Sequence, residues 1–506
     1  GDGTWSKSGL KGTVTVTPAK DGWTFSPSSR QVSGAAGNID FAATQSSSFP
    51  IAFEDPNLEA VVRETIGKPT GQLMNTDVVG IYRLFAIERN ISRLGGIEYL
   101  VGLDDLRVDD NQISDISPLA GLPGIRGLAI RSNQVSDISP LAGLTNLLSL
   151  ELDGNQVSDI SPLAGLTDLQ WLAMSHNQIS DISALAGLTN LERLVLDYNQ
   201  ISDITALEGL INLEWLILRD NQISDISSLA SLTKMEFLLL EQNQISGISA
   251  LAGLTSMKWL SLADNQVSDI GALAGLANME LLVLQGNQIS DISALAGKTN
   301  MQGLSLGYNQ ISGISALAGL TNLNSLGLAH NQISDISALA GLTNMRSLNL
   351  WHNQISDISA LAGLTDLEVL YSPSNQISDI GALAGLVNMK WLTLDSNQIS
   401  DISALAGLAN MELLSLTRNQ ISDIGALVAN PGLGSGDHIW LQYNQLDLAP
   451  DSDDMENINT LIRRGAEVDY EPQGPAPSAE IRSFDYEWRQ WGDIEFHPVT
   501  RMPMLP

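Results

Sequence analysis

Leucine alternates with variable residues in short stretches that return every 22 residues between about Leu103 and Arg418. In one stretch Leu150 and Leu152 precede Asn155, so the leucines share one face of an extended segment and residues 149, 151 and 153 share the other. This alternation predicts a short strand that is apolar on its inner side. The asparagine that closes each stretch occurs fifteen times, at Asn111, Asn133, Asn155, Asn177, Asn199, Asn221, Asn243, Asn265, Asn287, Asn309, Asn331, Asn353, Asn375, Asn397 and Asn419.

A single 22-residue unit cannot bury its own apolar side, so the copies must stack on one another. Stacked strands would lie parallel, roughly 4.8 Å apart, and each asparagine amide would pair with backbone groups where a strand ends. The residues that follow read D-I-S-x-L, which predicts a short helical turn on the outer side. We therefore predict an α/β solenoid with parallel strands on the concave face, short helical turns on the convex face, a small all-β N-terminal module and helical caps.

An aspartate stands four residues after the asparagine in thirteen of the fifteen repeats, beginning with Asp115, and Gly247 and Gly313 are the exceptions. Its place before I-S-x-L predicts an N-cap for the helical turn. A single aspartate column supplies too few oxygen ligands for calcium, so we favour capping over ion binding.

The chain divides by composition into five predicted parts. These are a partial β-sandwich module (1–45), a helical N-terminal cap (50–80), the solenoid (81–447), a C-terminal cap (448–473) and a strand-like aromatic tail (478–506). In the first part, alternating apolar residues predict strands at Thr13–Thr17, Trp23–Phe25 and Ile39–Ala43. Only half of a sandwich is present, which would expose an apolar face and a strand edge.

Both caps carry helix signals. Asp55 before Pro56 predicts a helix start and Gly67 its end. The inward residues predicted for this helix are Leu58, Val61, Val62 and Ile66. A second helix is predicted from Asp454 to Arg464, after a last distorted coil at Asn444. Its predicted inward residues are Met455, Ile458, Leu461 and Ile462.

Two coils depart from the repeat. Asn90 predicts an imperfect opening repeat whose Phe85 and Ile87 take the inward positions. Farther along, Ser372 replaces an inward leucine and Pro373 lacks an N–H, so we expect the strand ladder to weaken there.

The D-P-N-L-E cap, the N-Q-I-S-D-I-S-P-L-A-G-L-T-N unit and the closing segment resemble the internalin-like leucine-rich-repeat proteins of bacteria over about residues 50 to 473. The resemblance implies an extracellular or bacterial cell-surface protein that binds protein partners on its concave face and is not an enzyme. The sequence has no L-P-x-T-G motif, so the resemblance does not extend to covalent wall anchoring. The stretch T-V-T-P-A-K-D-G-W-T-F-S-P-S-S-R resembles the second half of small immunoglobulin-like or carboxypeptidase-regulatory-like domains.

Composition narrows the function further. A net charge of −32 argues against nucleic acid or an anionic membrane as partner. No apolar run approaches the roughly 18 residues of a membrane span, so we expect no membrane insertion. The chain has no cysteine, and it carries no H-E-x-x-H, G-x-S-x-G or Walker motif. We expect neither enzymatic activity nor a cofactor nor a metal.

The outward strand positions lie two, four and six residues before each asparagine, and we call them the −2, −4 and −6 columns. All six tryptophans of the array and its closing coil fall in these columns, and neighbouring apolar residues join several of them into one patch. Aromatic and arginine residues are typical of interface hot spots. The candidate partner-binding residues are Trp171, Arg193, Trp215, Ile217, Phe237, Leu239, Trp259, Leu281, Trp351, Tyr371 and Trp391. The alternative is that these side chains pack on one another and only stabilise strand pairing.

Two groups raise the question of a bound cation. His330 and His352 share a column but lack a carboxylate to complete a metal site. An acidic rim, made of Asp104, Asp105, Asp109 and Asp110, could carry solvated charge or attract a cation. For each group, a bound cation and a solvent-exposed polar surface both stay open as alternatives.

The aromatic tail suggests a second function. Its apolar residues alternate as in a strand, and they are Ile481, Phe484, Tyr486, Trp488, Trp491, Ile494 and Phe496. If the tail of one copy completed the N-terminal half sandwich of the next, the protein would form a head-to-tail filament by strand addition. The partner would then be a copy of the protein itself. Alternatively, the tail folds back on its own cap or is part of a downstream domain.

Overall fold

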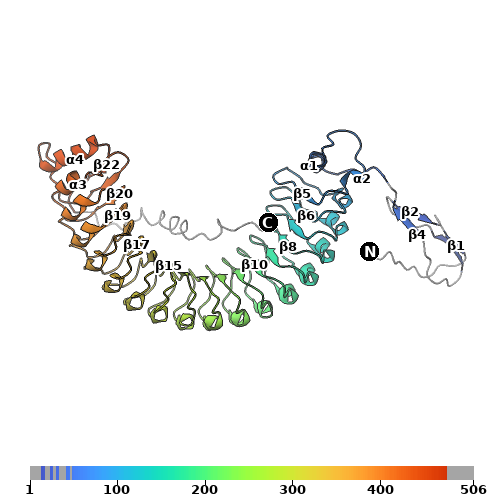
Figure 1. Ribbon diagram of the computed structural model, residues 1–506, viewed down its shortest axis with the longest axis horizontal. Coiled ribbons are helices and arrows are strands. Elements are labelled where there is room, and N and C mark those ends of the chain that lie inside the picture. The colour runs from blue at the N-terminus through green and yellow to red at the C-terminus, as the bar shows by residue number, and fades with distance from the viewer. Residues whose placement is uncertain (1–12, 17–22, 27–29, 34–41, 46–47, 476–506) are drawn as a thin grey trace. The chain divides into compact units, whose positions relative to one another are not determined.

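The computed structural model describes residues 13–16, 23–26, 30–33, 42–45 and 48–475. The chain separates into two compact units, Gly1–Gly327 (unit 1) and Leu328–Pro506 (unit 2). Figure 1 shows that both are built from repeated coils, each with a strand and a turn on opposite sides.

Unit 1 contains a parallel sheet of twelve short strands among its described residues. Each strand pairs with the next in a register offset of 22 residues, as in Leu84 with Leu106 and Leu150 with Leu172. The strands are β5 (Arg83–Phe85), β6 (Asp105–Arg107), β7 (Gly127–Ala129), β8 (Ser149–Glu151), β9 (Trp171–Ala173), β10 (Arg193–Val195), β11 (Trp215–Ile217), β12 (Phe237–Leu239), β13 (Trp259–Ser261), β14 (Leu281–Val283), β15 (Gly303–Ser305) and β16 (Ser325–Gly327). This sheet confirms the predicted leucine-rich-repeat solenoid.

The turns opposite the strands are 3-10 helices. In unit 1 they are η1 (Ile97–Tyr99), η2 (Ser117–Gly121), η3 (Ser139–Gly143), η4 (Ser161–Gly165), η5 (Ser183–Gly187), η6 (Thr205–Leu207), η7 (Ser227–Ser231), η8 (Ser249–Gly253), η9 (Gly271–Leu273), η10 (Ser293–Leu295) and η11 (Ser315–Leu317). Asp115 Oδ1 accepts a 2.8 Å hydrogen bond from the N–H of Ser117, but the N-cap residue itself is Ile116. The aspartate therefore stabilises the turn from the residue before the N-cap, one position earlier in the chain than predicted.

The asparagine column ties neighbouring coils together as predicted. Asn155 Oδ1 accepts a 2.9 Å hydrogen bond from the N–H of Val135 in the previous coil. Its Nδ2 donates to the carbonyl oxygens of Ile130 at 2.8 Å and Leu152 at 3.0 Å. These groups lie in a core of fully buried leucines, so each bond satisfies a backbone group that water cannot reach.

The N-terminal cap confirms the predicted helix. Helix α1 (Pro56–Ile66) begins after Asp55, which accepts a hydrogen bond from the N–H of Asn57, and ends at Gly67 with φ of 66°. A short helix, α2 (Asn75–Val78), follows. Asp55 also accepts hydrogen bonds from the N–H and hydroxyl of Ser92, at 2.7 and 3.0 Å. Burial favours a higher pKa for Asp55, but the hydrogen bonds outweigh it and lower the pKa. This carboxylate joins the cap to the first coil.

The prediction for the first coil was wrong by one residue. Leu84 and Ala86 point inward and are fully buried, whereas Phe85 is 50% and Ile87 42% exposed. Strand β5 pairs with β6 in the same 22-residue register as the later strands, which places Arg89 in the asparagine column. Asn90 lies one residue after that column, so counting the strand positions back from Asn90 shifted the predicted inward residues by one. The sheet register sets the inward face, because a shift of one residue turns every side chain over.

The described N-terminal strands form two antiparallel pairs. Strand β1 (Thr13–Val16) pairs with β3 (Arg30–Ser33), and β2 (Trp23–Ser26) pairs with β4 (Ala42–Gln45). The first two predicted strands are confirmed, and β3 was not predicted. The third predicted strand overlaps β4 at residues 42 and 43, while residues 39–41 lie outside the described part of the chain. The resemblance to an immunoglobulin-like half sandwich stays a prediction.

Unit 2 repeats the same construction. Its described parallel strands are β17 (Ser347–Asn349), β18 (Val369–Tyr371), β19 (Trp391–Thr393), β20 (Leu413–Ser415), β21 (His438–Trp440) and β22 (Glu467–Asp469). Its helices are η12 (Ser337–Leu339), η13 (Ser359–Leu361), η14 (Gly381–Gly385), η15 (Ser403–Gly407), α3 (Gly425–Ala429) and α4 (Asp453–Arg463). The last distorted coil is confirmed, because Asn444 Oδ1 accepts a 3.1 Å hydrogen bond from the N–H of Ile421.

The ladder does not weaken at Ser372 and Pro373, so that prediction was wrong. Strand β18 pairs with both β17 and β19, and the N–H of Ser372 donates to the carbonyl of Thr393 at 2.9 Å. In this column the N–H points away from the ladder. Two coils later, for example, the N–H of Thr417 donates to a side chain, Asp395 Oδ1, at 2.8 Å. Proline at this position therefore removes no ladder hydrogen bond.

The helix of the C-terminal cap, α4, begins and ends one residue earlier than predicted. Ser452 caps α4, whose Ile458 and Leu461 are fully buried. Ile462, predicted to face the last coil, is exposed. Strand β22 was not predicted, and it extends the sheet by pairing with β21. The aromatic tail at 478–506 lies outside the described residues.

Candidate functional site

The largest predicted patch forms a continuous row on the strand side of unit 1. Strands β9 to β14 are paired in register, so their −6 residues stand side by side. We call this row the aromatic stripe, and its members are Trp171, Arg193, Trp215, Phe237, Trp259 and Leu281. All six residues are half-buried.

Neighbouring members of the aromatic stripe from Trp171 to Trp259 are in contact. The guanidinium carbon of Arg193 lies 5.4 Å from the ring centroid of Trp171 and 5.2 Å from that of Trp215. The ring centroids of Trp215 and Phe237 are 4.0 Å apart at 33°, and those of Phe237 and Trp259 are 4.9 Å apart at 69°. The stripe is therefore packed from Trp171 to Trp259, as the strand-stabilising interpretation expects. Trp215 has Arg193 on one side of its ring and Phe237 on the other, so this ring offers mainly its edge to a partner.

The −4 column behind the stripe is more enclosed than predicted. Ile217 is only 3% and Leu239 only 7% exposed, although both point to the outward side of the strands. Residues two positions apart on one strand face lie about 7 Å apart, so long side chains in the −6 and −2 columns can cover the −4 residues between them. Ile217 and Leu239 thus form the floor under the stripe and offer little contact area of their own.

The −2 column carries a charged ladder that the sequence reasoning did not single out. Asp197 is buried and accepts hydrogen bonds from Arg219, at 2.8 Å from its N–H and 2.7 Å from its Nη2. Glu241 follows in the next coil, and its Oε2 is buried with no hydrogen-bond partner. Burial raises the pKa of Glu241, although the nearby Ser261 hydroxyl and Arg219 favour the charged form. The order Asp, Arg, Glu in successive repeats was the signal that could have revealed this ladder.

A further column, one residue before the stripe, is mostly acidic. It contains Glu192, Glu214, Glu236, Lys258 and Glu280. Lys258 Nζ lies 2.7 Å from Glu236 Oε2, and this hydrogen bond raises the pKa of the lysine. The stripe is therefore bordered by carboxylates on this side as well.

The candidate residues of unit 2 are less concentrated. Trp351, Tyr371 and Trp391 occupy the −2, −4 and −6 columns respectively, so they do not form one row. The ring of Trp351 meets that of His330 edge to face at a centroid distance of 4.4 Å. Trp391 Nε1 donates to Glu412 Oε2 at 3.3 Å.

The two groups that raised the question of a cation have other contacts. The rings of His330 and His352 stack with centroids 4.5 Å apart. Within the described ranges, no cluster of three or more histidine, aspartate or glutamate side chains could hold a metal. In the acidic rim, Arg131 bridges Asp109 at 3.2 Å and Glu151 at 3.1 Å. Arginines also face Asp104 and Asp105, at 4.0 and 3.5 Å, so three of the four rim carboxylates have a cationic neighbour.

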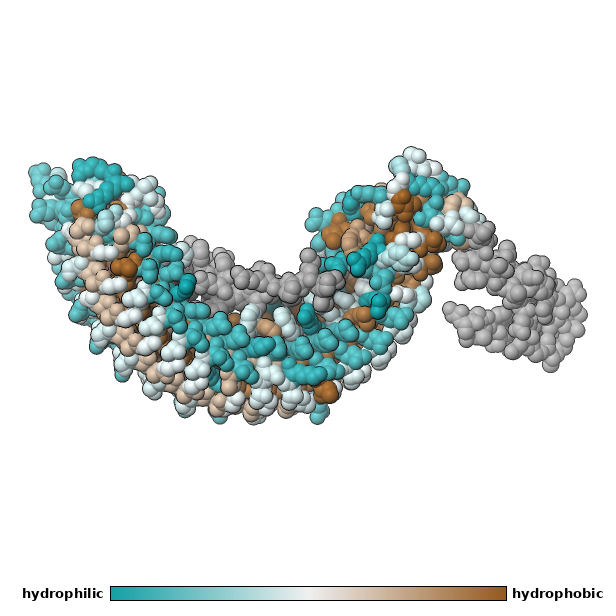
Figure 2. Space-filling model, in the orientation of Figure 1, coloured by the Kyte–Doolittle hydropathy of each residue, from teal (hydrophilic) through white to brown (hydrophobic). Residues whose placement is uncertain are grey.

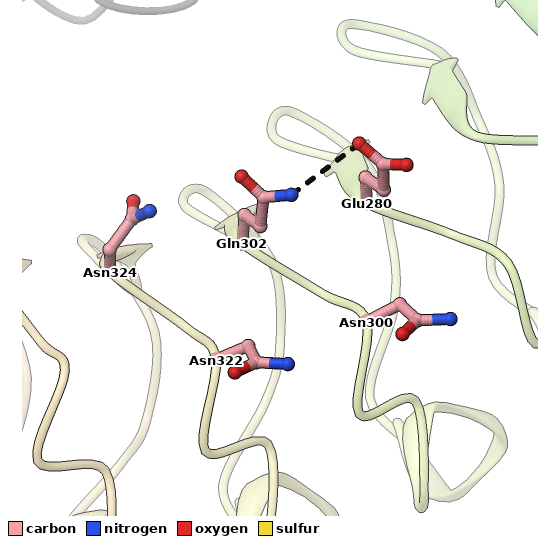
Figure 3. A pocket seen from close by; sticks show the side chains of 5 residues that line it. All are labelled: Glu280, Asn300, Gln302, Asn322 and Asn324. Carbon is pink, nitrogen blue, oxygen red and sulfur yellow. Dashed lines mark hydrogen bonds between the residues drawn. The ribbon is translucent and has the colours of Figure 1, made fainter.

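One hollow on unit 1, of about 320 Å³, is lined by amides (Figure 3). Its lining residues are Glu280, Asn300, Gln302, Asn322 and Asn324. Gln302 Nε2 donates to Glu280 Oε2 at 3.4 Å, and the amides of Asn300 and Asn322 donate to carbonyls of the preceding coil. Figure 3 shows the five side chains in two rows on successive coils, Glu280, Gln302 and Asn324 in one and Asn300 and Asn322 in the other, so they do not converge on one point. The hollow contains no nucleophile paired with a base.

Hydrophobic surface also gathers at the N-terminal end of unit 1 (Figure 2). The exposed large apolar residues there are Val79, Tyr82, Phe85, Ile87 and Val101. Phe85 carries the guanidinium of Arg107 at 5.4 Å from its ring centroid. The sequence did not predict this patch, because it placed Phe85 and Ile87 inward, whereas the register of β5 turns them outward.

Comparison with protein families and solved structures identifies the repeat. The family model for leucine-rich repeats (2 copies) matches residues 123–165, 167–209, 211–253, 255–297, 299–341 and 343–385. An internalin of Listeria monocytogenes (InlF) is 32% identical, with a TM-score of 0.54, over 72% of this chain and 96% of the internalin. The chain is an internalin-like leucine-rich-repeat protein.

Two other structures share the fold of this internalin-like protein. A leucine-rich-repeat protein of Leptospira interrogans has a TM-score of 0.66 at 22% identity, covering 78% of this chain and 97% of its own. The functional domain of InlJ from Listeria monocytogenes has a TM-score of 0.63 at 19% identity, covering 77% and 81%. A comparison with curated proteins gives no match.

The family gives a coarse function. Leucine-rich-repeat domains are scaffolds that bind protein partners, and this internalin-like chain shares their fold. In the described part of the chain, no helix is both long and apolar enough to span a membrane.

Proposed function

We propose that this protein is a non-enzymatic scaffold that binds a protein partner on the strand side of unit 1, across the aromatic stripe. The observation that supports this is the concentration of three tryptophans, a phenylalanine and an arginine in one row of half-buried side chains. Tryptophan and arginine are the residues most enriched in binding hot spots.

The packing within the stripe strengthens this proposal. Side chains that are already stacked lose little conformational freedom on binding, so a partner that covers their edges gains contact at a small entropic cost. The buried floor of Ile217 and Leu239 supports the row from beneath. Stability of the ladder and binding of a partner are therefore compatible roles for the same residues.

The test is the double variant Trp215→Asp and Trp259→Asp. Partners captured by the full-length wild-type protein are identified by mass spectrometry, and the affinity of each purified partner is then measured for wild type and variant. We expect the variant to lose at least about a hundredfold in affinity, because two hot-spot residues are each worth about 2 kcal/mol or more. Circular dichroism checks that the variant retains its fold.

Ser325→Asp is the matched control, since Ser325 occupies the same −6 column outside the aromatic stripe. We expect it to bind the partner as the wild type does. Equal binding by the wild type and the double variant would exclude the stripe as the binding site.

We further propose that the scaffold acts outside the cell or on a bacterial cell surface, in adhesion. The support is the likeness to an internalin. The test is whether protease added to intact producing cells degrades the protein. Full protection of the protein until the cells are lysed would contradict an extracellular location.

A structural subunit of an extracellular filament is the second candidate. The described strands β1 to β4 form only two-stranded sheets, which are marginally stable unless something covers them. An added strand from the tail of another copy would provide that cover. Light scattering at increasing concentration tests this: growth that deletion of residues 478–506 abolishes would support the filament, and a monomer at every concentration would exclude it.

A further inference from the structure

The surface around the aromatic stripe has a strongly unequal charge. The column one residue before the stripe and the −2 column hold six carboxylates between Glu192 and Glu280, against three basic groups in these columns and the stripe. The carboxylates are Glu192, Asp197, Glu214, Glu236, Glu241 and Glu280. The basic groups are Arg193, Arg219 and Lys258.

All three basic groups have partners within the protein. Arg193 lies between two indole rings, Arg219 pairs with Asp197 at 2.7 Å, and Lys258 pairs with Glu236 at 2.7 Å. These contacts neutralise two of the six carboxylates, Asp197 and Glu236. The remaining excess of negative charge lies on both sides of the apolar row.

Among these carboxylates, Glu241 is incompletely paired. It stands in the −2 column next to the floor residue Leu239, and its Oε2 is buried without a hydrogen-bond partner. Arg219, the nearest cation, already donates to Asp197. A partly desolvated carboxylate with incomplete pairing interacts more strongly with an approaching cation than a fully hydrated one does.

We infer that the stripe accepts a basic, amphipathic segment of a protein partner, with apolar side chains over the ring edges and lysine or arginine side chains over the carboxylates on either side. This inference rests on the function proposed above and adds the chemical class of the partner. Because the stripe crosses six parallel strands roughly 4.8 Å apart, it is about 24 Å long, which about eight extended residues would span.

Other ligand classes fit this surface less well. A nucleic acid would place phosphates against the carboxylates, which costs free energy instead of releasing counterions. A flat ligand, such as a base or sugar ring, would need an open ring face, whereas Trp215 at the centre of the stripe has Arg193 on one side of its ring and Phe237 on the other. An acidic segment of a protein would meet like charge on both sides.

Three fluorescently labelled peptides of about eight to ten residues test the inference on the full-length protein. The first alternates leucine with lysine, the second alternates leucine with glutamate, and the third alternates serine with lysine. Affinities are measured by fluorescence anisotropy at low and at physiological salt. We expect the first peptide to bind at least about tenfold more tightly than either of the others, with an affinity that falls as salt rises.

Two pairs of substitutions separate local charge from the overall charge of the chain. Glu192→Gln with Glu214→Gln removes two carboxylates beside the stripe, and Asp168→Asn with Glu208→Gln removes two exposed carboxylates off the strand face of unit 1. Both variants change the net charge equally. We expect the first pair to weaken the leucine–lysine peptide about five- to tenfold and the second pair to change its affinity less than about twofold.

The outcomes distinguish this inference from the proposed function. If the leucine–glutamate peptide binds as tightly as the leucine–lysine peptide and Trp215→Asp with Trp259→Asp abolishes both, the stripe is a binding site but the charge inference fails. If the leucine–lysine peptide binds the tryptophan variant unchanged, its attraction is to the bulk charge and the inference fails. Absence of binding by every peptide also overturns the inference, while the proposed function is judged separately by the captured partner.

Discussion

Two neighbouring regions of unit 1 share one core but present different surfaces. In the coils of β9 to β14, the −6 column carries the aromatic stripe, while in β15 and β16 the same column holds Gly303 and Ser325. The inward residues are equivalent, because Leu216 and Leu304 are both fully buried. Because both regions form the same coil with different −6 residues, the leucines and asparagines are enough to specify the coil. The residues in the outward columns can therefore vary without loss of the fold, and a binding site is best sought among them.

The largest expected effect is on stability and comes from removing the repeat asparagine, which both regions share. Asn221→Leu, in the stripe, and Asn309→Leu, beyond it, each remove a side chain that accepts an N–H from the previous coil at 2.9 Å and donates to buried carbonyls. We expect each to lower the free energy of unfolding by about 3–5 kcal/mol, because several buried backbone groups lose their partners. Urea denaturation followed by circular dichroism measures the loss.

The two losses should agree within about 1 kcal/mol, since the asparagine contacts are the same in both coils. A large loss at Asn221 with none at Asn309 would show that the stripe, and not the shared core, stabilises the coil.

A smaller effect is expected on the face where the regions differ. Trp215→Ala removes a ring that contacts both Phe237 and Arg193, so we expect a loss of about 1–2 kcal/mol in the free energy of unfolding. Ser325→Ala, in the same column of β16, should change it by less than about 0.5 kcal/mol. Equal effects would mean that the stacked rings contribute nothing to the ladder.

The smallest effect concerns the −2 column, where Glu241 in the stripe region corresponds to Gln285 beyond Ala263. Burial raises the pKa of Glu241 in the folded protein above its value in the unfolded chain. At pH values between these two pKa values, the folded protein therefore binds more protons than the unfolded chain does. Stability therefore falls as pH rises from the unfolded pKa through the folded pKa. We expect Glu241→Gln, which cannot ionise, to become more stable relative to wild type as pH rises from about 4 to about 7.

Thermal unfolding of the wild type and Glu241→Gln across that pH range checks the sign. A stability difference that stays constant with pH would show that the carboxylate of Glu241 is as well solvated in the folded state as in the unfolded chain.

The sequence predicted the repeating architecture well because its signals are local and periodic. The alternation of Leu150 and Leu152 predicted a strand, and Asp55 with Gly67 predicted both ends of α1. The columns of the stripe could also be read directly, since a constant period of 22 residues places Trp215 beside Phe237. Where the period failed, at Asn90, the prediction of the inward residues failed as well.

What the sequence determined by itself, then, was the period, the inward leucines and asparagines, and the identity of the side chains in each outward column. Only the tertiary structure decided how those side chains share the surface. It covered Ile217 and Leu239, stacked Arg193 between two indoles and left an oxygen of Glu241 without a partner. The physical reason is that periodicity sets which backbone positions are neighbours, whereas burial and pairing depend on the length and direction of side chains from several coils at once.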